Sequence, residues 1–178
     1  PTTEGWSATP FVNTAAGPVL DDQGSGIDAW IVDDNGSAVG DVGWYRHELT
    51  GAQVAQTALY GWKLSAYLRV VDFPDPAPGQ PAIGFDASPF VSFNDGAVNR
   101  SFFLGGQADG DPVLWLPTGF APSPTGLEIP LEGAGAGYHL YEMIQDPADG
   151  MVDVFVDGTE VASDFPGAPL QSAWNVNF

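Results

Sequence analysis

Paired carboxylates are the first chemistry to look for, because glycoside hydrolysis needs two of them on one face of a sheet. The six glutamates are Glu4, Glu48, Glu128, Glu132, Glu142 and Glu160. None belongs to the closely spaced Glu/Asp strand motif with which sandwich-fold glucanases place a nucleophile and an acid. Glu142 is a candidate for an inward-facing position on its strand, but a lone carboxylate there is more often paired or at a sheet edge than catalytic. The carboxylates therefore do not indicate a glycosidase.

The histidines give no catalytic arrangement either. His47 and His139 are the only two in the chain. A Ser-His-Asp triad needs a positioned histidine, and neither lies in a nucleophile-elbow sequence. Two histidines without a cysteine also fall short of the usual zinc site. We expect both to be exposed histidines on strands, and we predict that the protein is not an enzyme.

Calcium is the metal that suits the many aspartates, because it takes hard oxygen ligands. The aspartate clusters are Asp33-Asp34-Asn35, Asp72 with Asp75, Asp109 with Asp111, and Asp146 with Asp149. None has EF-hand spacing, and aspartate in loops commonly forms turns through hydrogen bonds to the nearby backbone. Turn formation and calcium binding are both open for each cluster, so the sequence establishes no cofactor and leaves calcium as a candidate.

Aromatic rings with polar neighbours offer a further kind of chemistry, because a pyranose has one apolar face and a ring of hydroxyls. Six tryptophans are many for this length, and since a sandwich buries tryptophan readily, we expect at least four in the core. Trp115 lies beside a proline loop, with Asp109 and Asp111 nearby. Tyr67 and Arg69 lie on the polar face of a strand, where they contact either a ligand or solvent. The candidate ligand-binding residues are Tyr67, Arg69, Asn99, Arg100 and Trp115. The arginines and Asn99 would supply hydrogen bonds, and the aromatic rings would supply a stacking face.

Alternation of apolar and polar residues with a period of two predicts the strands that position these groups. Trp62–Asp72 is the clearest, with Leu64, Ala66, Leu68 and Val70 on one side and Lys63, Ser65, Tyr67, Arg69 and Val71 on the other. Gly137–Ile144 and Met151–Val156 show the same alternation. Asp157-Gly158 predicts a type I′ hairpin turn into a second arm, Thr159–Ser163. Further predicted strands are Ala29–Val32, Val39–Leu49, Ala82–Asp86, Pro89–Phe93, Arg100–Leu104 and Ala173–Phe178.

One short helix interrupts the predicted strands. Thr50 is its predicted N-cap and Gly61 its end, and one face is shared by Val54, Ala55, Ala58 and Leu59. The proline-rich segments Pro74–Pro81 and Pro117–Pro124 are predicted loops. These elements predict an all-β fold: a two-sheet antiparallel jelly-roll β-sandwich with one short helix, in a single domain over residues 1–178.

The composition limits the partners. The chain has 178 residues and a formal net charge of −19, from four Lys and Arg against 23 Asp and Glu. Nucleic acid is excluded as a partner, since polyanion binding needs clustered Lys and Arg. No apolar run reaches the roughly 18 residues of a membrane span, so we expect no membrane insertion. The start at Pro1 predicts a processed or excised segment, and the acidic composition favours an extracellular or cell-surface protein.

A series of short motifs follows a familiar order along the chain. The motifs are Gly5-Trp6, Ala29-Trp30-Ile31-Val32, Trp44-Tyr45, Gly61-Trp62-Lys63-Leu64, Ile83-Gly84-Phe85-Asp86, Phe90-Val91-Ser92-Phe93, Asn99-Arg100-Ser101, Tyr138-His139-Leu140-Tyr141 and Val154-Phe155-Val156-Asp157-Gly158. In this order they resemble the lectin-like wing domain of secreted bacterial sialidases, and the last two are shared with laminin-G-like sandwiches generally. The resemblance implies a concanavalin A-like jelly roll that binds carbohydrate, in some members sialic acid, without hydrolysing it.

The sequence departs from that family in two places. Where the family can have a basic residue that helps to hold the sialic acid carboxylate, this chain has Pro78-Gly79-Gln80-Pro81, which carries no charge. After Trp174 the family continues into another strand, whereas this sequence stops at Phe178. Either the sequence is truncated there, or the missing strand leaves an open sheet edge that copies of the protein fill by exchanging strands. The extended segment Pro1–Phe11 is the candidate donor.

The sequence thus predicts a non-catalytic, extracellular, lectin-like domain of a secreted enzyme or adhesin, with a glycan as its partner. The alternative is a structural subunit of an extracellular fibre or surface array, in which copies associate through the open sheet edge.

Overall fold

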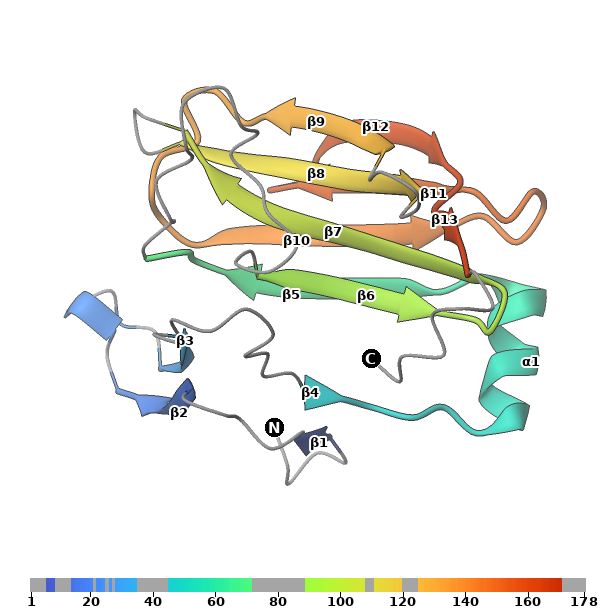
Figure 1. Cartoon of the computed structure of the whole chain (residues 1–178), viewed down its shortest axis with the longest axis horizontal. Helices are drawn as coiled ribbons and strands as arrows, with labels where there is room; N and C mark the ends of the chain where they lie inside the picture. The colour runs from blue at the N-terminus through green and yellow to red at the C-terminus, as the bar shows by residue number, and fades with distance from the viewer. Residues whose placement is uncertain are drawn as a thin grey trace. The chain divides into compact units, whose positions relative to one another are not determined.

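The computed structural model of the protein describes residues 6–8, 14–20, 22–24, 26, 28–34, 45–71, 89–107, 111–119 and 125–170 (Figure 1). The chain divides into two compact units, one mainly in Pro1–Leu49 and the other in Thr50–Asn175. The predicted strands Ala82–Asp86 and Ala173–Phe178 lie outside the described residues, as does the predicted loop Pro74–Pro81.

The described residues of the N-terminal unit form two pairs of antiparallel strands. Strand β1 (Ser7–Ala8) pairs with β4 (Tyr45–Arg46), the described strand within the predicted Val39–Leu49. Strand β2 (Thr14–Val19) pairs with β3 (Ala29–Asp34), which confirms the predicted strand there, and a short 3-10 helix, η2 (Asp22–Gly24), lies between them. Within the candidate donor segment Pro1–Phe11, Ser7 and Ala8 are paired with β4 of the same chain and are therefore not free for exchange in this structure.

In the larger unit, the described residues form two antiparallel sheets. The four-stranded sheet has the order β12-β11-β10-β5. Its strands are β5 (Lys63–Leu68), β10 (His139–Gln145), β11 (Val152–Val156) and β12 (Thr159–Phe165). The five-stranded sheet has the order β13-β7-β8-β9, and β6 also pairs with β7. Its strands are β6 (Phe90–Asn94), β7 (Val98–Gly106), β8 (Pro112–Gly119), β9 (Thr125–Pro130) and β13 (Ala168–Pro169).

One hydrophobic core holds the two sheets face to face. It combines side chains of the five-stranded sheet, Phe102, Leu104, Leu114 and Leu116, with Tyr141, Met143, Val152, Val154, Val156 and Phe165 of the four-stranded sheet. Within each strand these residues mostly alternate, so each sheet gives one face to the core. Figure 1 shows the two layers. The predicted all-β class and the antiparallel two-sheet sandwich are confirmed.

The order of the strands explains how distant segments come together. The chain passes from the four-stranded sheet to the other sheet after β5 and returns after β9, so β5 pairs directly with β10. Such crossings between sheets are typical of jelly-roll connectivity. The tight turn at Asp157-Gly158 joins β11 to β12 with φ of 50° and 79°, as the predicted type I′ turn requires.

The single α-helix of the described residues, α1 (Gly51–Tyr60), has the predicted ends. The Gln53 backbone N–H donates to Thr50 Oγ1 (3.3 Å), and the Thr50 N–H donates to Gln53 Oε1 (2.8 Å), which forms a capping box. Gly61 follows at φ 72°, where a Cβ would also collide with the carbonyl oxygen of Gln145. A glycine is therefore needed where the helix turns into β5.

Strands β8 and β9 were not among the predicted strands. The predicted loop Pro117–Pro124 is wrong at its start, because Pro117–Gly119 belong to β8. Proline lacks the N–H that a sheet ladder uses, but it is tolerated at a bulge. Pro117 meets this condition, since it faces Gly126 at a register shift and lies beyond the part of β8 that pairs with β7.

Candidate functional site

Strand β5 places Tyr67 on the outer face of the four-stranded sheet. Its inward residues Leu64 and Leu68 pack against the core, while Lys63, Ser65 and Tyr67 are exposed. This alternation is the predicted one. Tyr67 is 55% exposed and lies opposite Leu140 of β10. The sandwich therefore presents a tyrosine ring to solvent from the edge strand of the four-stranded sheet.

Tyr138 joins Tyr67 and Arg69 from the residue just before β10. The rings of Tyr67 and Tyr138 are stacked, with centroids 5.3 Å apart and planes 17° from parallel. The guanidinium carbon of Arg69 lies 5.4 Å from the centroid of the Tyr138 ring, within cation–π range. We call Tyr67, Arg69 and Tyr138 the tyrosine platform. The structure thus brings together two of the predicted site residues and adds a third that was not predicted.

A polar group lies beside the platform on the same face. Glu142 of β10 is opposite Ser65 of β5 in the sheet register. Ser65 Oγ donates to Glu142 Oε1 (3.0 Å), and Lys63 Nζ forms an ion pair with the same oxygen. The hydrogen bond from Lys63, more than the one from Ser65, holds the pKa of the Glu142 carboxyl below its ordinary value. We call Lys63, Ser65 and Glu142 the polar row.

The position of Glu142 corrects its predicted inward orientation. The buried residues of β10 are His139, Tyr141 and Met143, and strand alternation puts Glu142 on the opposite face. It is paired, as a lone carboxylate usually is. Ser65 and Tyr67 are two residues apart on one face of β5, which corresponds to about 7 Å. The platform and the polar row therefore offer a stacking surface and hydrogen-bonding groups side by side.

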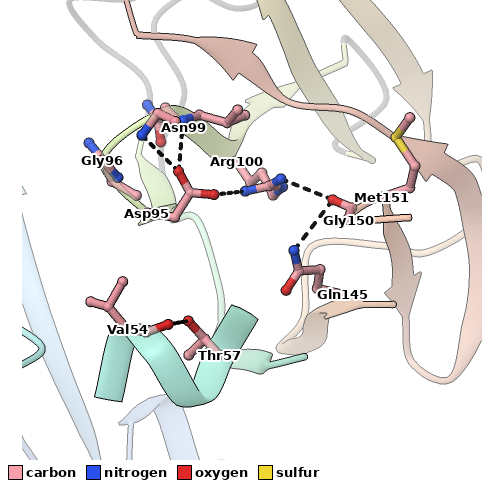
Figure 2. A network of polar contacts seen from close by, with 12 residues as sticks. Val54, Thr57, Asp95, Gly96, Asn99, Arg100, Gln145, Gly150 and Met151 are labelled. Atoms are coloured by element: carbon pink, nitrogen blue, oxygen red, sulfur yellow. Dashed lines mark hydrogen bonds and ion pairs between the residues drawn. The ribbon is translucent and has the colours of Figure 1, made fainter. Parts of the chain in front are cut away.

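Arg100 lies inside the protein and away from this face. It is 6% exposed, and its Nη1 forms an ion pair with Asp95 Oδ2 (2.7 Å) while its Nη2 donates to the Gly150 carbonyl (2.9 Å). Figure 2 shows this contact, with Gln145 Nε2 donating to the same carbonyl. Arg100 therefore links the β6–β7 turn to the β10–β11 turn. We call Asp95, Arg100 and Gly150 the arginine network.

The environment of Asp95 favours its charged form. Burial raises its pKa, but hydrogen bonds from the backbone N–H groups of Val98 and Ala97 and from Arg100 outweigh this, and the net effect is a lowered pKa. The neighbouring Asn99, also predicted as a ligand residue, is buried and accepts a hydrogen bond from Ser92 Oγ (2.5 Å). The structure does not bring Asn99 or Arg100 to the tyrosine platform.

Trp115 lies on the other sheet. It is half-buried on β8, where its ring packs at 5.4 Å from that of Phe103 in a small cluster with Phe90 and Val113. A Cβ at Gly126 would collide with its indole nitrogen, so the ring lies directly over β9. Two further tryptophans, Trp6 and Trp30, are exposed and so are not among the tryptophans predicted for the core. Trp44 and Trp174 lie outside the described residues.

In the predicted cluster of Asp146 and Asp149, both carboxylates form turns with the nearby backbone. Asp146 Oδ1 accepts from Ala148 N–H (2.7 Å), and Asp149 Oδ1 accepts from Met151 N–H (2.8 Å). Within residues that the structure describes, no group of three or more His, Asp or Glu side chains could hold a metal ion. Asp72, Asp75, Asp109 and the side chains of Asp33 and Asp34 are outside this part of the chain, so the calcium prediction stays untested there.

His139 is buried, which corrects its predicted exposure. Its strand position faces the core side, and only 7% of the residue is exposed. A cavity of about 10 Å³ lies beside it, lined by Val70, Gly135 and Tyr141 among others. This volume holds one water molecule at most, so the cavity is no sugar site.

In comparisons with known proteins, no family model and no curated protein matches the chain. In the described part of the chain, no helix has the length and apolar character needed to cross a membrane.

Proposed function

We propose that this protein is a non-catalytic, lectin-like domain that binds a neutral glycan on the outer face of its four-stranded sheet. The observation that carries the proposal is the tyrosine platform, in which the Tyr67 ring is exposed, beside the polar row. One face of a pyranose is apolar and stacks on an aromatic ring, while its hydroxyls need hydrogen-bond partners at the ring edge. The resemblance to sialidase wing domains independently favours carbohydrate.

The charges favour a neutral sugar over sialic acid. The chain carries a net charge of −19, and Glu142 in the polar row is held ionised by Lys63. A carboxylate accepts hydrogen bonds from sugar hydroxyls but repels an anionic sugar. This departs from the sialic acid that the resemblance implies for some family members.

The same carboxylate argues against hydrolysis. A glycosidase needs a carboxylic acid with a raised pKa to protonate the leaving oxygen, whereas the pKa of Glu142 is lowered. Glu142 is suited to holding a hydroxyl, and the domain would serve to bring a secreted enzyme or adhesin to its glycan. An acidic surface without cysteine fits an extracellular or cell-surface setting.

The test is a glycan array, followed by calorimetry with methyl glycosides of galactose, glucose and mannose, and with sialic acid as the anionic comparison. Tyr67→Ala should weaken binding of the neutral glycoside about tenfold, because it removes the stacking ring. Since Tyr67 is exposed, the unfolding temperature should barely change. Tyr60→Ala is the matched control, because Tyr60 is a tyrosine of α1 that is 74% exposed.

Binding that survives Tyr67→Ala at full affinity would exclude the platform as the site. Preferential binding of sialic acid would contradict the neutral-sugar proposal. Running the array with calcium and with a chelator tests the aspartate clusters, since loss of binding with chelator would require a calcium site.

A further inference from the structure

Both ring nitrogens of the buried His139 face acceptors. Nδ1 lies 2.7 Å from Asp157 Oδ2, and Nε2 lies 3.0 Å from the carbonyl oxygen of Gly135. A carbonyl only accepts, and an ionised carboxylate only accepts. Neutral imidazole has one N–H and can satisfy one of these two contacts, whereas imidazolium donates to both. The geometry therefore suits the protonated ring.

The charged and titratable groups around His139 support that assignment. Burial lowers the pKa of His139, but the hydrogen bond to Asp157, the bond to Gly135 and the charges of Asp157 and Asp111 outweigh it, so the pKa lies above the ordinary 6.5. Tyr141, whose ring meets the imidazole edge to face, has a pKa raised by burial and stays neutral. The bond to His139 in turn lowers the pKa of Asp157.

The loop before β10, residues 132–137, connects His139 to the tyrosine platform. Asp111 accepts hydrogen bonds from the backbone N–H groups of Gly133 (2.5 Å) and Gly135 (2.7 Å), and His139 holds the Gly135 carbonyl. Tyr138 lies between this loop and His139 in the chain. Its stacking on Tyr67 therefore depends on backbone that is fixed on one side by the loop and on the other by His139.

We propose that protonation of His139 controls the tyrosine platform, so that the site binds its sugar more tightly when His139 is charged. When the ring loses its proton, the remaining N–H stays with the charged Asp157, because charge-assisted hydrogen bonds are the stronger ones. The lone pair of Nε2 then faces the Gly135 carbonyl, the loop shifts, and Tyr138 leaves its stacked position. The change in sugar affinity rests on the proposed function, whereas the movement of Tyr138 on loss of the His139 proton does not.

The sugar-free measurement comes first. NMR should give a His139 pKa above 6.5, and contacts between the Tyr67 and Tyr138 rings should weaken as the pH rises through that pKa. Since the folded pKa is raised, the stability contributed by His139 is complete below 6.5 and is lost as the pH rises through the folded value. Asp157 acts in the opposite direction, because its lowered pKa makes its contribution fade as the pH falls through the folded value.

The binding measurement uses the tightest neutral methyl glycoside of the panel. Its affinity should fall about fivefold or more as His139 loses its proton. Because coupling is reciprocal, saturating glycoside should raise the pKa of His139 by the logarithm of the same affinity ratio.

Variants separate His139 from other groups. Asp157→Asn keeps a residue that tolerates the φ of 50° at this turn, and it should move the midpoint of the pH dependence to lower pH. His139→Gln should abolish the dependence. His47→Gln, which changes the only other histidine, should leave it intact.

Ring contacts that stay constant through the His139 titration would overturn the proposal even if sugar binds. Ring contacts that open with pH in a protein that binds no sugar at any pH would support control of the platform and overturn only the sugar-binding function. An unchanged midpoint in Asp157→Asn would also overturn the proposal.

Discussion

Arg69 and Arg100 lie in different settings in one sandwich: Arg69 is half-buried, and Arg100 is buried. Arg69 follows β5 and contacts the ring face of Tyr138, next to the exposed Tyr67. Arg100 is buried on β7 and bonds to Asp95 and to the Gly150 carbonyl. One arginine belongs to a surface that can meet a ligand, and the other closes the end of the fold between two turns.

The difference shows how placement divides similar residues between binding and stability. A buried guanidinium must have its charge compensated, since an unpaired buried charge is costly. Once Arg100 is paired in this way, its donors serve the fold. The Arg69 guanidinium lies over the half-buried ring of Tyr138, next to the exposed Tyr67, and adds to a surface where a sugar can stack. Mutations in the two regions should therefore affect different measurements.

The largest effect is expected at Arg100. Arg100→Ala should lower the free energy of unfolding by about 3 kcal/mol, because it leaves Asp95 charged and partly buried without its partner. Sugar affinity, measured where the variant is folded, should be unchanged. Chemical denaturation and calorimetry give the two quantities.

Arg46→Ala is the matched control for this change. Arg46 forms an exposed ion pair with Glu48 (3.0 Å), and such pairs contribute less than about 1 kcal/mol. Equal destabilisation by the two variants would contradict the structural role of the arginine network. A selective loss of sugar binding in Arg100→Ala would mean that Arg100 contributes to the binding site, as the sequence predicted.

Trp115 should behave like Arg100 rather than like Tyr67. Trp115→Ala removes a half-buried ring from the cluster with Phe90, Phe103 and Val113, and it should cost about 2 kcal/mol of stability. Trp115→Phe should recover part of that loss. Thermal unfolding checks both, and a stable Trp115→Ala that no longer binds sugar would place the site on the five-stranded sheet.

Local pattern was enough to predict much of the fold and part of the platform. The alternation of β5 determines that Tyr67 faces outward, because Leu64 and Leu68 must face the core. The capping box at Thr50 and Gln53, and the turn at Asp157-Gly158, are likewise local features. Each depends on residues that are close in sequence.

The parts of the fold and of the candidate site that the sequence did not predict depend mostly on pairing between distant segments. Tyr138 meets Tyr67 only because β10 pairs with β5 in one particular register, which no local pattern specifies. The same register puts Glu142 beside Ser65 and sends His139 to the buried side. Strand β8 was missed because Pro117 reads as a loop residue until the bulge opposite β9 is known.

The smallest effect, and the sharpest test of the polar row, is expected from Glu142→Gln. The substitution keeps the size of the side chain and one acceptor oxygen but removes the charge that pairs with Lys63. A hydrogen bond to a charged group is stronger than a neutral one, so affinity for the neutral glycoside should fall about fivefold. The unfolding temperature should change little, because Lys63 is half exposed and can turn to solvent, and the retained amide oxygen still accepts from Ser65.

Glu160→Gln separates that local effect from the general charge. Glu160 is exposed on β12 and lies across from Phe155, which in turn lies across from Glu142, so both glutamates are on the same face. Both substitutions remove one negative charge, but Glu142 alone adjoins the platform through Ser65 and Lys63. An equal drop in affinity for both variants would mean that the field of the acidic surface, and not a hydrogen bond from Glu142, governs sugar binding. A drop confined to Glu142→Gln would mean that the platform and the polar row hold one ligand together.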